Sequence, residues 1–180
     1  MRDGTTLACT VTDSDWCARD WPAGGTRPRV MKLYRLEREQ IVPRPVEETF
    51  RFFADPRNLK DLTPAALHFR FAKEPPAMLA AGMVLDYRIR LYGIPVNWRT
   101  RIDIWEPPSR FVDSQLRGPY SSWRHTHTFE DAGGERTRVR DSVEFALPMG
   151  PLGAIAYRLF VARSLKRIFD FRAERLKSLL

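Results

Sequence analysis

The chain has 180 residues, and its 30 lysine and arginine residues outnumber its 22 aspartate and glutamate residues, which gives a formal net charge of +8. This length suits one domain that buries a core without disulfides or metals. Cys9 and Cys17 are the only cysteines, so the remainder of the chain has neither a disulfide framework nor a cysteine–zinc site. The sequence contains no run of about 18 apolar residues and no uninterrupted apolar leader, so we expect a cytoplasmic protein.

Residues 1–30 differ from the rest of the sequence. The stretch WPAGGTRPRV is rich in proline, glycine and arginine and has neither helical nor strand periodicity, whereas regular alternation begins near Met31. Acidic and basic residues balance in this segment, so the whole positive charge falls on residues 31–180. We expect residues 1–30 to form a disordered or loosely packed extension and residues 31–180 to form a single domain.

Hydrophobic periodicity predicts one strand, two short helices and then a meander of strands. The first strand covers residues 33–42, and helical spacing of apolar residues follows over 45–54. A second short helix is expected at 56–64. Pro64 ends it, because the residue before a proline avoids the helical region. Six further strands are predicted between turns rich in glycine and proline, at 66–73, 82–92, 94–105, 109–117, 120–130 and 135–147.

The last thirty residues predict one long helix. Apolar residues recur there at steps of three, four or seven, which gives a face that can cover a sheet. Basic residues are expected on the opposite face, where they suit peripheral contact with an anionic membrane; we expect no specific nucleic-acid binding. The apolar set is Leu152, Ile155, Leu159, Ala162, Phe169, Ala173, Leu176 and Leu180, and the basic set is Arg158, Arg163, Lys166, Arg167, Arg172, Arg175 and Lys177.

This order of elements resembles the START-like, or helix-grip, superfamily of SRPBCC proteins. The stretches GPYSSWRHTHTFE, TRVRDSVEFALPMGPLG and RIFDFRAERL are similar to those of a bacterial subgroup of uncharacterised SRPBCC ligand-binding proteins, related to polyketide cyclases and coenzyme Q-binding START-like proteins. The resemblance implies an α+β helix-grip fold, in which a curved antiparallel sheet of about seven strands wraps around the C-terminal helix. It also implies a cavity between sheet and helix that holds a hydrophobic small molecule.

Two histidines on one strand are the main candidate site residues. His125 and His127 stand two residues apart in SSWRHTHTFE, so they share a strand face with Trp123 and Phe129, and we expect that face to point inward. On the next strand Asp141 shares the apolar face. A buried carboxylate needs a partner, and a histidine of the adjacent strand is the nearest one.

Further candidates come from the other strands. Alternation over residues 109–117 does not decide which face is inward, and Gln115 is a candidate from that strand. His68, the third histidine, is expected at the surface. The predicted ligand-binding residues are Tyr87, Trp98, Gln115, Tyr120, Trp123, His125, His127 and Asp141.

The histidine pair has four interpretations. With Asp141 it supplies three ligands of the kinds that zinc and iron sites use. Alternatively, His125 or His127 is a general base that Asp141 orients. Both histidines can instead line a binding cavity, or form a hydrogen-bonded core pair with Asp141 and no ligand. We expect the cavity-wall role, with neither a metal nor a cofactor.

These observations predict a binding or carrier protein for a hydrophobic small molecule such as a lipid, a quinone or a polyketide-like aromatic. One alternative is an enzyme resembling polyketide cyclases, dehydratases or hydrolases, with His125 or His127 as general base. Another alternative is a regulatory protein-interaction module whose basic helix docks on an acidic surface.

Overall fold

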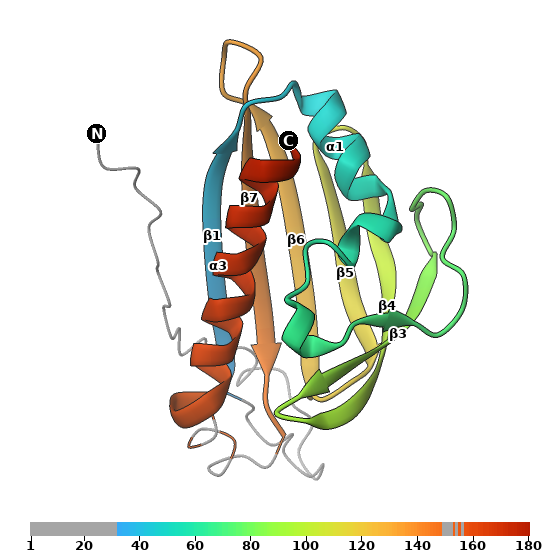
Figure 1. Cartoon of the computed structure of the whole chain (residues 1–180), viewed down its shortest axis with the longest axis vertical. Coiled ribbons are helices and arrows are strands. Elements are labelled where there is room, and N and C mark those ends of the chain that lie inside the picture. The colour runs from blue at the N-terminus through green and yellow to red at the C-terminus, as the bar shows by residue number, and fades with distance from the viewer. Residues whose placement is uncertain (1–31, 149–152, 154, 156) are drawn as a thin grey trace, which may run out of the picture.

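A single antiparallel sheet of seven strands is the frame of the protein (Figure 1). The computed structural model describes residues 32–148, 153, 155 and 157–180, and the expected N-terminal extension lies outside them. The strand order is β1-β7-β6-β5-β4-β3-β2, so the first strand pairs with the last and the others follow as a meander. The strands are β1 (Leu33–Val42), β2 (Arg70–Phe71), β3 (Val84–Leu91), β4 (Ile94–Glu106), β5 (Arg110–Arg117), β6 (Ser122–Asp131) and β7 (Thr137–Ala146).

Two helices cover one face of this sheet. Helix α1 (Val46–Ala54) follows β1, and the short 3₁₀ turns η1 (Pro56–Leu59) and η2 (Ala65–Leu67) lead on to β2. At the other end of the chain the π-helical turn η3 (Tyr157–Val161) runs into α3 (Ala162–Leu179). In Figure 1, α3 lies in front of β1 and β7 and α1 lies on the same face, which is the expected α+β helix-grip arrangement. None of the described helices is long and apolar enough to cross a membrane.

Side-chain alternation places the core between sheet and helices. On β7 the residues Val139, Asp141, Val143 and Phe145 are buried, whereas Arg140 between them is exposed. On α1 the rings of Phe50 and Phe53 are buried and meet the ring of Phe129 from β6. The inward and outward faces predicted for β6 and β7 are therefore confirmed.

The predicted strand at 66–73 is wrong at its beginning. Residues 65–67 form η2 after Pro64, and His68 closes that turn in the left-handed conformation with a φ of 47°. Only Arg70–Phe71 pairs with β3. His68 itself is exposed, as expected. The helix expected at 56–64 is also shorter than predicted. Only the 3₁₀ turn η1 forms, which starts at Pro56 and ends at Leu59.

An irregularity in β4 changes which side chains face inward. The pairing with β5 shifts between Ile102 and Ile104, and such a bulge turns the following residues over. Trp105 rather than Ile104 therefore enters the core, where its ring meets those of Phe50 and Phe111. Strict alternation had placed Ile104 on the inner face, and the bulge overturns that assignment.

The predicted apolar face of the last helix also needs correction. Ile155 and Leu159 are 55% and 57% exposed, whereas Tyr157 and Leu165 are buried. A π-helical turn adds a residue to the helical repeat and rotates the preceding segment relative to α3. Leu152 lies outside the described residues, as does the side chain of Arg158. Arg172, placed on the solvent face by the sequence, points to the sheet with Phe169 and Leu176, and its side chain is 12% exposed.

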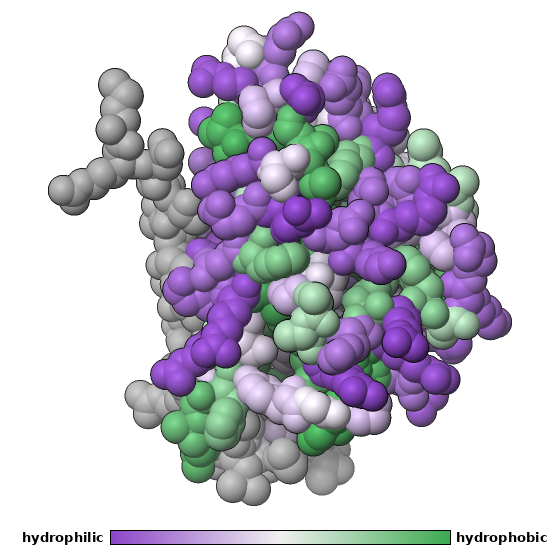
Figure 2. Space-filling view, in the orientation of Figure 1, coloured by the Kyte–Doolittle hydropathy of each residue, from purple (hydrophilic) through white to green (hydrophobic). Residues whose placement is uncertain are grey.

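One contact joins the start of this helical segment to the β3–β4 turn. The hydroxyl of Tyr92 donates a hydrogen bond to the carbonyl oxygen of Phe160 at 2.8 Å, and the two rings meet edge to face. Both residues are more than half exposed. In Figure 2 hydrophilic residues cover the middle of α3, whereas hydrophobic residues gather at the lower end of this helical segment, where Ile155, Leu159 and Phe160 are exposed.

Candidate functional site

A cavity of about 180 Å³ lies between the sheet and the helices. Strands β3 to β6 form one wall, and α3 together with the segment from α1 to η2 forms the other. Most of the lining side chains are aliphatic or aromatic, and the exceptions from the sheet include Thr100, Asp113, His125 and His127. The cavity is therefore a mostly apolar space with a cluster of polar groups on its sheet wall, and Asp55, Asn58, Thr63 and Arg172 line it from the helical side.

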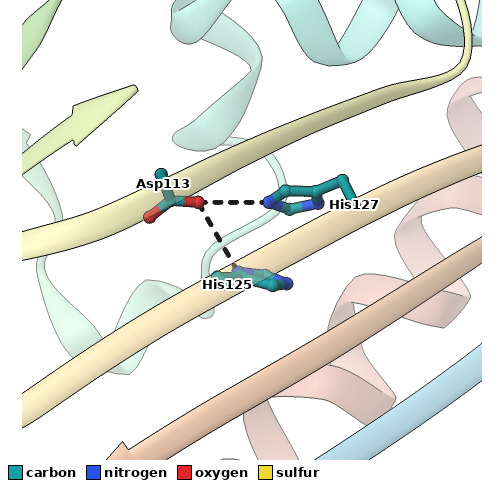
Figure 3. A group of neighbouring side chains, drawn as sticks. All are labelled: Asp113, His125 and His127. Carbon is teal, nitrogen blue, oxygen red and sulfur yellow. Dashed lines mark hydrogen bonds and ion pairs between the residues drawn. The ribbon is translucent and has the colours of Figure 1, made fainter. Parts of the chain in front are cut away.

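The polar cluster is built on three neighbouring strands. His125 and His127 come from β6, and strand pairing sets Asp113 of β5 opposite His125 and Asp141 of β7 opposite His127. Both histidines and Asp141 are 5% exposed. Figure 3 shows Asp113 and the two imidazole rings directed at one another. The sheet register alone is enough to bring these four side chains together.

Each imidazole ring lies between both carboxylates. His125 Nε2 makes a hydrogen bond of 2.9 Å with Asp141 Oδ1, and its Nδ1 lies 3.9 Å from Asp113 Oδ2. His127 has the opposite orientation, with Nε2 at 3.3 Å from Asp113 Oδ2. Its Nδ1 lies 2.8 Å from Asp141 Oδ1, out of line for a hydrogen bond. The ring centroids of the two histidines are 3.8 Å apart.

Neighbouring side chains hold this cluster in place. Thr100 on β4 donates a hydrogen bond of 2.9 Å to Asp113 Oδ1. The ring of Phe111 stacks on His127 with centroids 4.2 Å apart. Arg172 of α3 places Nη1 at 3.9 Å from Asp141 Oδ1 and lies over the ring of Phe169. The helix therefore contributes a cation to a site whose acidic and imidazole groups all come from the sheet.

Burial and mutual charge shift the pKa values in opposite directions. Burial, together with the charge of His127, lowers the pKa of His125 to about 4 against the effect of Asp141. Burial also acts to lower the pKa of His127, but its two carboxylate neighbours outweigh burial and raise it. For Asp113 and Asp141 burial acts to raise the pKa, and contacts with the histidines lower it, strongly so for Asp141. These shifts favour the neutral form of the His125 imidazole and the charged form of the His127 imidazole.

Six of the eight predicted ligand-binding residues line the cavity. Asp141 does not line it and instead contacts the histidines from the neighbouring strand. Gln115 also lies outside the lining, because its amide donates a 2.8 Å hydrogen bond to the carbonyl oxygen of Tyr120 and so braces the turn before β6. The six lining residues are Tyr87, Trp98, Tyr120, Trp123, His125 and His127.

Sequence reasoning missed two members of the cluster. Asp113 follows a buried Val112 on a strand with polar residues on both faces, so alternation did not select it. Arg172 was counted with the solvent-exposed basic residues. A signal for Asp113 existed: it pairs with Ile102, which alternation had placed in the interior of the adjacent strand.

Aromatic rings form a second feature of the cavity wall. Trp98 stacks on Tyr87 with ring centroids 6.0 Å apart and meets Trp123 edge to face at 5.4 Å. Burial and the charge of Asp113 raise the pKa of Tyr87, so its hydroxyl stays neutral. Trp98 is 8% exposed, and its indole Nε1 has no hydrogen-bond partner among the described residues. Buried indole N–H groups usually have a partner, so this donor is free for a group in the cavity.

Solved structures share this fold at low sequence identity. The Zhui aromatase/cyclase from Streptomyces sp. R1128 superposes with a TM-score of 0.64 and 16% identity, covering 81% of this chain and 92% of that one. Truncated norcoclaurine synthase from Thalictrum flavum has a TM-score of 0.63 and 14% identity, covering 83% and 96%. Protein Ms6760 from Mycobacterium smegmatis has a TM-score of 0.58 and 17% identity, covering 81% and 89%. At these identities the likeness establishes the fold alone.

Sequence comparison identifies the family. No curated protein matches this sequence. The sequence profile of the family described as polyketide cyclase / dehydrase and lipid transport matches residues 34–180, which include every strand, both helices and the whole polar cluster. The chain therefore belongs to the polyketide cyclase / dehydrase and lipid transport family, within the helix-grip superfamily.

Proposed function

We propose that the protein binds and carries a hydrophobic small molecule whose polar end meets the cluster of Asp113, His125 and His127. The observation that supports this most is the composition of the cavity wall, which is mostly aliphatic and aromatic and carries that cluster on its sheet side. Trp98, whose N–H has no partner among the described residues, belongs to the same wall. Small-molecule sites commonly combine an apolar wall with a few placed polar groups that orient the ligand. The family to which the chain belongs fits such a role.

Cavity size favours a ring-shaped ligand group. The cavity holds about 180 Å³, and an apolar cavity of about 150 Å³ is large enough for benzene. A single aromatic or quinone ring therefore fits without rearrangement, whereas two acyl chains do not. The free N–H of Trp98 calls for an acceptor on the ligand, such as a ketone, quinone or ether oxygen.

Removing the Trp123 ring should release the ligand. Trp123→Ala takes away an aromatic wall that contacts both Trp98 and Tyr120, and we expect retention to fall at least about tenfold, since a buried aromatic contributes both area and ring contacts. Native mass spectrometry of the protein purified gently from bacterial cells measures the bound fraction, and denaturing extraction gives the mass of the ligand.

A matched control distinguishes loss of the cavity wall from a general effect of the substitution on the protein. Ile94→Ala removes an apolar side chain that is 66% exposed and should leave retention unchanged. Trp98→Phe keeps a smaller aromatic ring and deletes the N–H, and should weaken retention by at least roughly 2- to 12-fold, the value of one hydrogen bond. Unchanged retention in a folded Trp123→Ala variant would remove Trp123 from the proposed site.

The same cluster supports a second candidate function, in which the protein enolises a carbonyl compound. His125 uses Nε2 for Asp141, which leaves the Nδ1 lone pair of a neutral ring beside Asp113 and the cavity. His127, kept charged by its two carboxylates, is placed to donate a proton. A base and an acid side by side are what proton transfer next to a carbonyl requires.

Deuterium exchange tests this second candidate without knowledge of the natural substrate. With benzoylacetone as probe, the wild-type protein should speed exchange at the carbon between the carbonyls by about 10²-fold or more over buffer, as expected of a positioned acid and base. His125→Gln combined with His127→Gln should remove the effect, and His68→Gln should keep it. NMR measures the exchange rate. Equal rates in the wild-type protein and the double variant would rule out catalysis by the histidines.

A further inference from the structure

We propose that Asp113, His125 and His127 form a binding site for a divalent transition-metal ion, with Asp141 as the residue that orients both histidines. This inference goes beyond the proposed carrier function and does not depend on it. It also departs from the sequence-based expectation of no metal, which considered a His-x-His pair without knowledge of Asp113.

The donor atoms stand at spacings that suit one ion. One ligand atom from each of the three residues lies within 4.8 Å of the other two. Donors bound to one zinc-like ion at about 2.0–2.2 Å are about 3.4 Å apart in tetrahedral geometry. The distance from His127 Nε2 to Asp113 Oδ2 is 3.3 Å, and that from His125 Nδ1 to the same oxygen is 3.9 Å. Small ring rotations are enough to bring all three donors onto an ion.

Asp141 occupies the position that supporting carboxylates have in metal sites. Its Oδ1 contacts His125 Nε2 and His127 Nδ1 at 2.9 Å and 2.8 Å. Those are the two nitrogens that do not face Asp113. Asp141 already makes a hydrogen bond with His125, and a rotation of the His127 ring that brings its Nδ1 into line lets the same carboxylate oxygen accept from both rings. Metal-bound histidines almost always donate the other N–H in this way.

Asp113 is supported in the same manner. Thr100 donates a hydrogen bond to Asp113 Oδ1, which leaves Oδ2 as the oxygen directed at both rings (Figure 3). When both rings are neutral and their outer nitrogens are turned to Asp141, two imidazole lone pairs and a carboxylate oxygen converge on one small volume. A metal ion at that point replaces the proton that the charged His127 ring otherwise holds toward Asp113, and it binds both rings, whereas a proton serves only one.

The remaining coordination positions face the cavity. Asp113, His125 and His127 all belong to its lining, so an ion held by them has an open side toward the enclosed space. Two histidines and one carboxylate with open positions suit zinc and iron(II) in particular. Arg172, which also lines the cavity, compensates the charge of Asp141 and leaves Asp113 for the ion.

Cobalt(II) titration of the full-length, untagged protein tests the site, because low-coordinate cobalt(II) gives strong visible bands. The background carries Cys9→Ser and Cys17→Ser so that thiolates contribute nothing. We expect saturation at one equivalent and displacement of the bands by zinc(II). Loss of one ligand in Asp113→Asn or His127→Gln should weaken affinity by at least about 100-fold, and Asp141→Asn by about 10- to 100-fold, as for other supporting carboxylates.

Controls keep the outcome decisive. His68→Gln removes the exposed histidine and should leave affinity unchanged. Circular dichroism reports whether each variant folds. If the histidine variant does not fold, Asp113→Cys provides a second test, because it keeps both histidines and supplies a thiolate ligand. It should bind cobalt(II), unlike Asp113→Asn, and add a sulfur-to-cobalt charge-transfer band. Absence of saturable bands, or equal affinity in folded Asp113→Asn and His68→Gln, would overturn the proposal. The titration uses no organic ligand, and the retention measurement is repeated on protein purified in the presence of a chelator, so either proposal can fail without the other.

Discussion

Replacing Asp141 by alanine is expected to lower the free energy of unfolding by about 3–5 kcal/mol, the usual cost of removing one partner from a buried set of charges. Asp141 is 5% exposed and contacts both histidines and Arg172. Without its carboxylate a charged imidazole and a largely buried guanidinium lose their nearest counter-charge. Urea unfolding in the presence of a chelator measures the loss on the metal-free protein.

A surface pair provides the comparison for Asp141. Asp86 makes a two-point ion pair with Arg99, whose side chain is 51% exposed, and Asp86→Ala should cost no more than about 1 kcal/mol. Asp141→Asn keeps the shape and one acceptor, and should fall between the two. A loss below about 1 kcal/mol for Asp141→Ala would mean that the four groups do not depend on one another as described.

Replacing Phe145 by alanine should have a similar effect for a different reason. Its side chain is 1% exposed and meets Tyr34, Tyr120, Trp123 and Tyr157. Phenylalanine-to-alanine changes in a packed core cost about 3–5 kcal/mol through lost burial and a residual cavity. Urea unfolding monitored by circular dichroism measures this loss. The expected result is a lower urea midpoint with an unchanged dependence of the unfolding free energy on urea concentration.

Phe145 also links stability to the binding cavity. Trp123 and Tyr120 line the cavity, and the rings of both contact Phe145. Phe145→Ala should therefore also reduce retention of the proposed ligand. Phe145→Leu refills most of the space and should recover more than half of the lost stability. If Phe145→Ala costs less than about 1 kcal/mol, as an exposed residue would, the packing at this end of the sheet is looser than the contacts indicate.

The meander from β3 to β7 and the faces of β6 and β7 followed from local patterns, because β6 and β7 keep a period of two and the turns between these strands carry glycine or proline. The pairing of β1 with β7 does not follow from any local pattern. His125, His127 and Asp141 could be placed inward for that reason: on β6 and β7 the apolar residues all fall on one face. Their pairing was predictable too, since consecutive strands joined by a tight turn lie side by side. Alternation supplied a face and a neighbouring strand, and those were enough to place three of the four side chains of the polar cluster.

The rest of the cluster depends on features that a period cannot express. Asp113 lies on a strand that buries Phe111 and Val112 in succession, so neither face is marked as inward. Arg172 lies three residues after Phe169 and four before Leu176, so helical spacing places it on the buried face of α3. Its charge alone assigned it to the solvent-exposed basic set, and the carboxylate of Asp141 on the sheet is the counter-charge that the helix sequence does not reveal.

The hydrogen bond between Tyr92 and Phe160 bears on how fast the proposed ligand exchanges rather than on how strongly it binds. Tyr92 directly follows Leu91, and Leu91 and Leu165 of α3 both line the cavity. A ligand that entered between the β3–β4 turn and the helix would have to part this contact and let it re-form. Because the contact would be intact before and after the passage, it would slow arrival and departure by the same factor and leave the dissociation constant unchanged. On this route, two exposed rings that do not line the cavity would set part of the residence time of the proposed ligand.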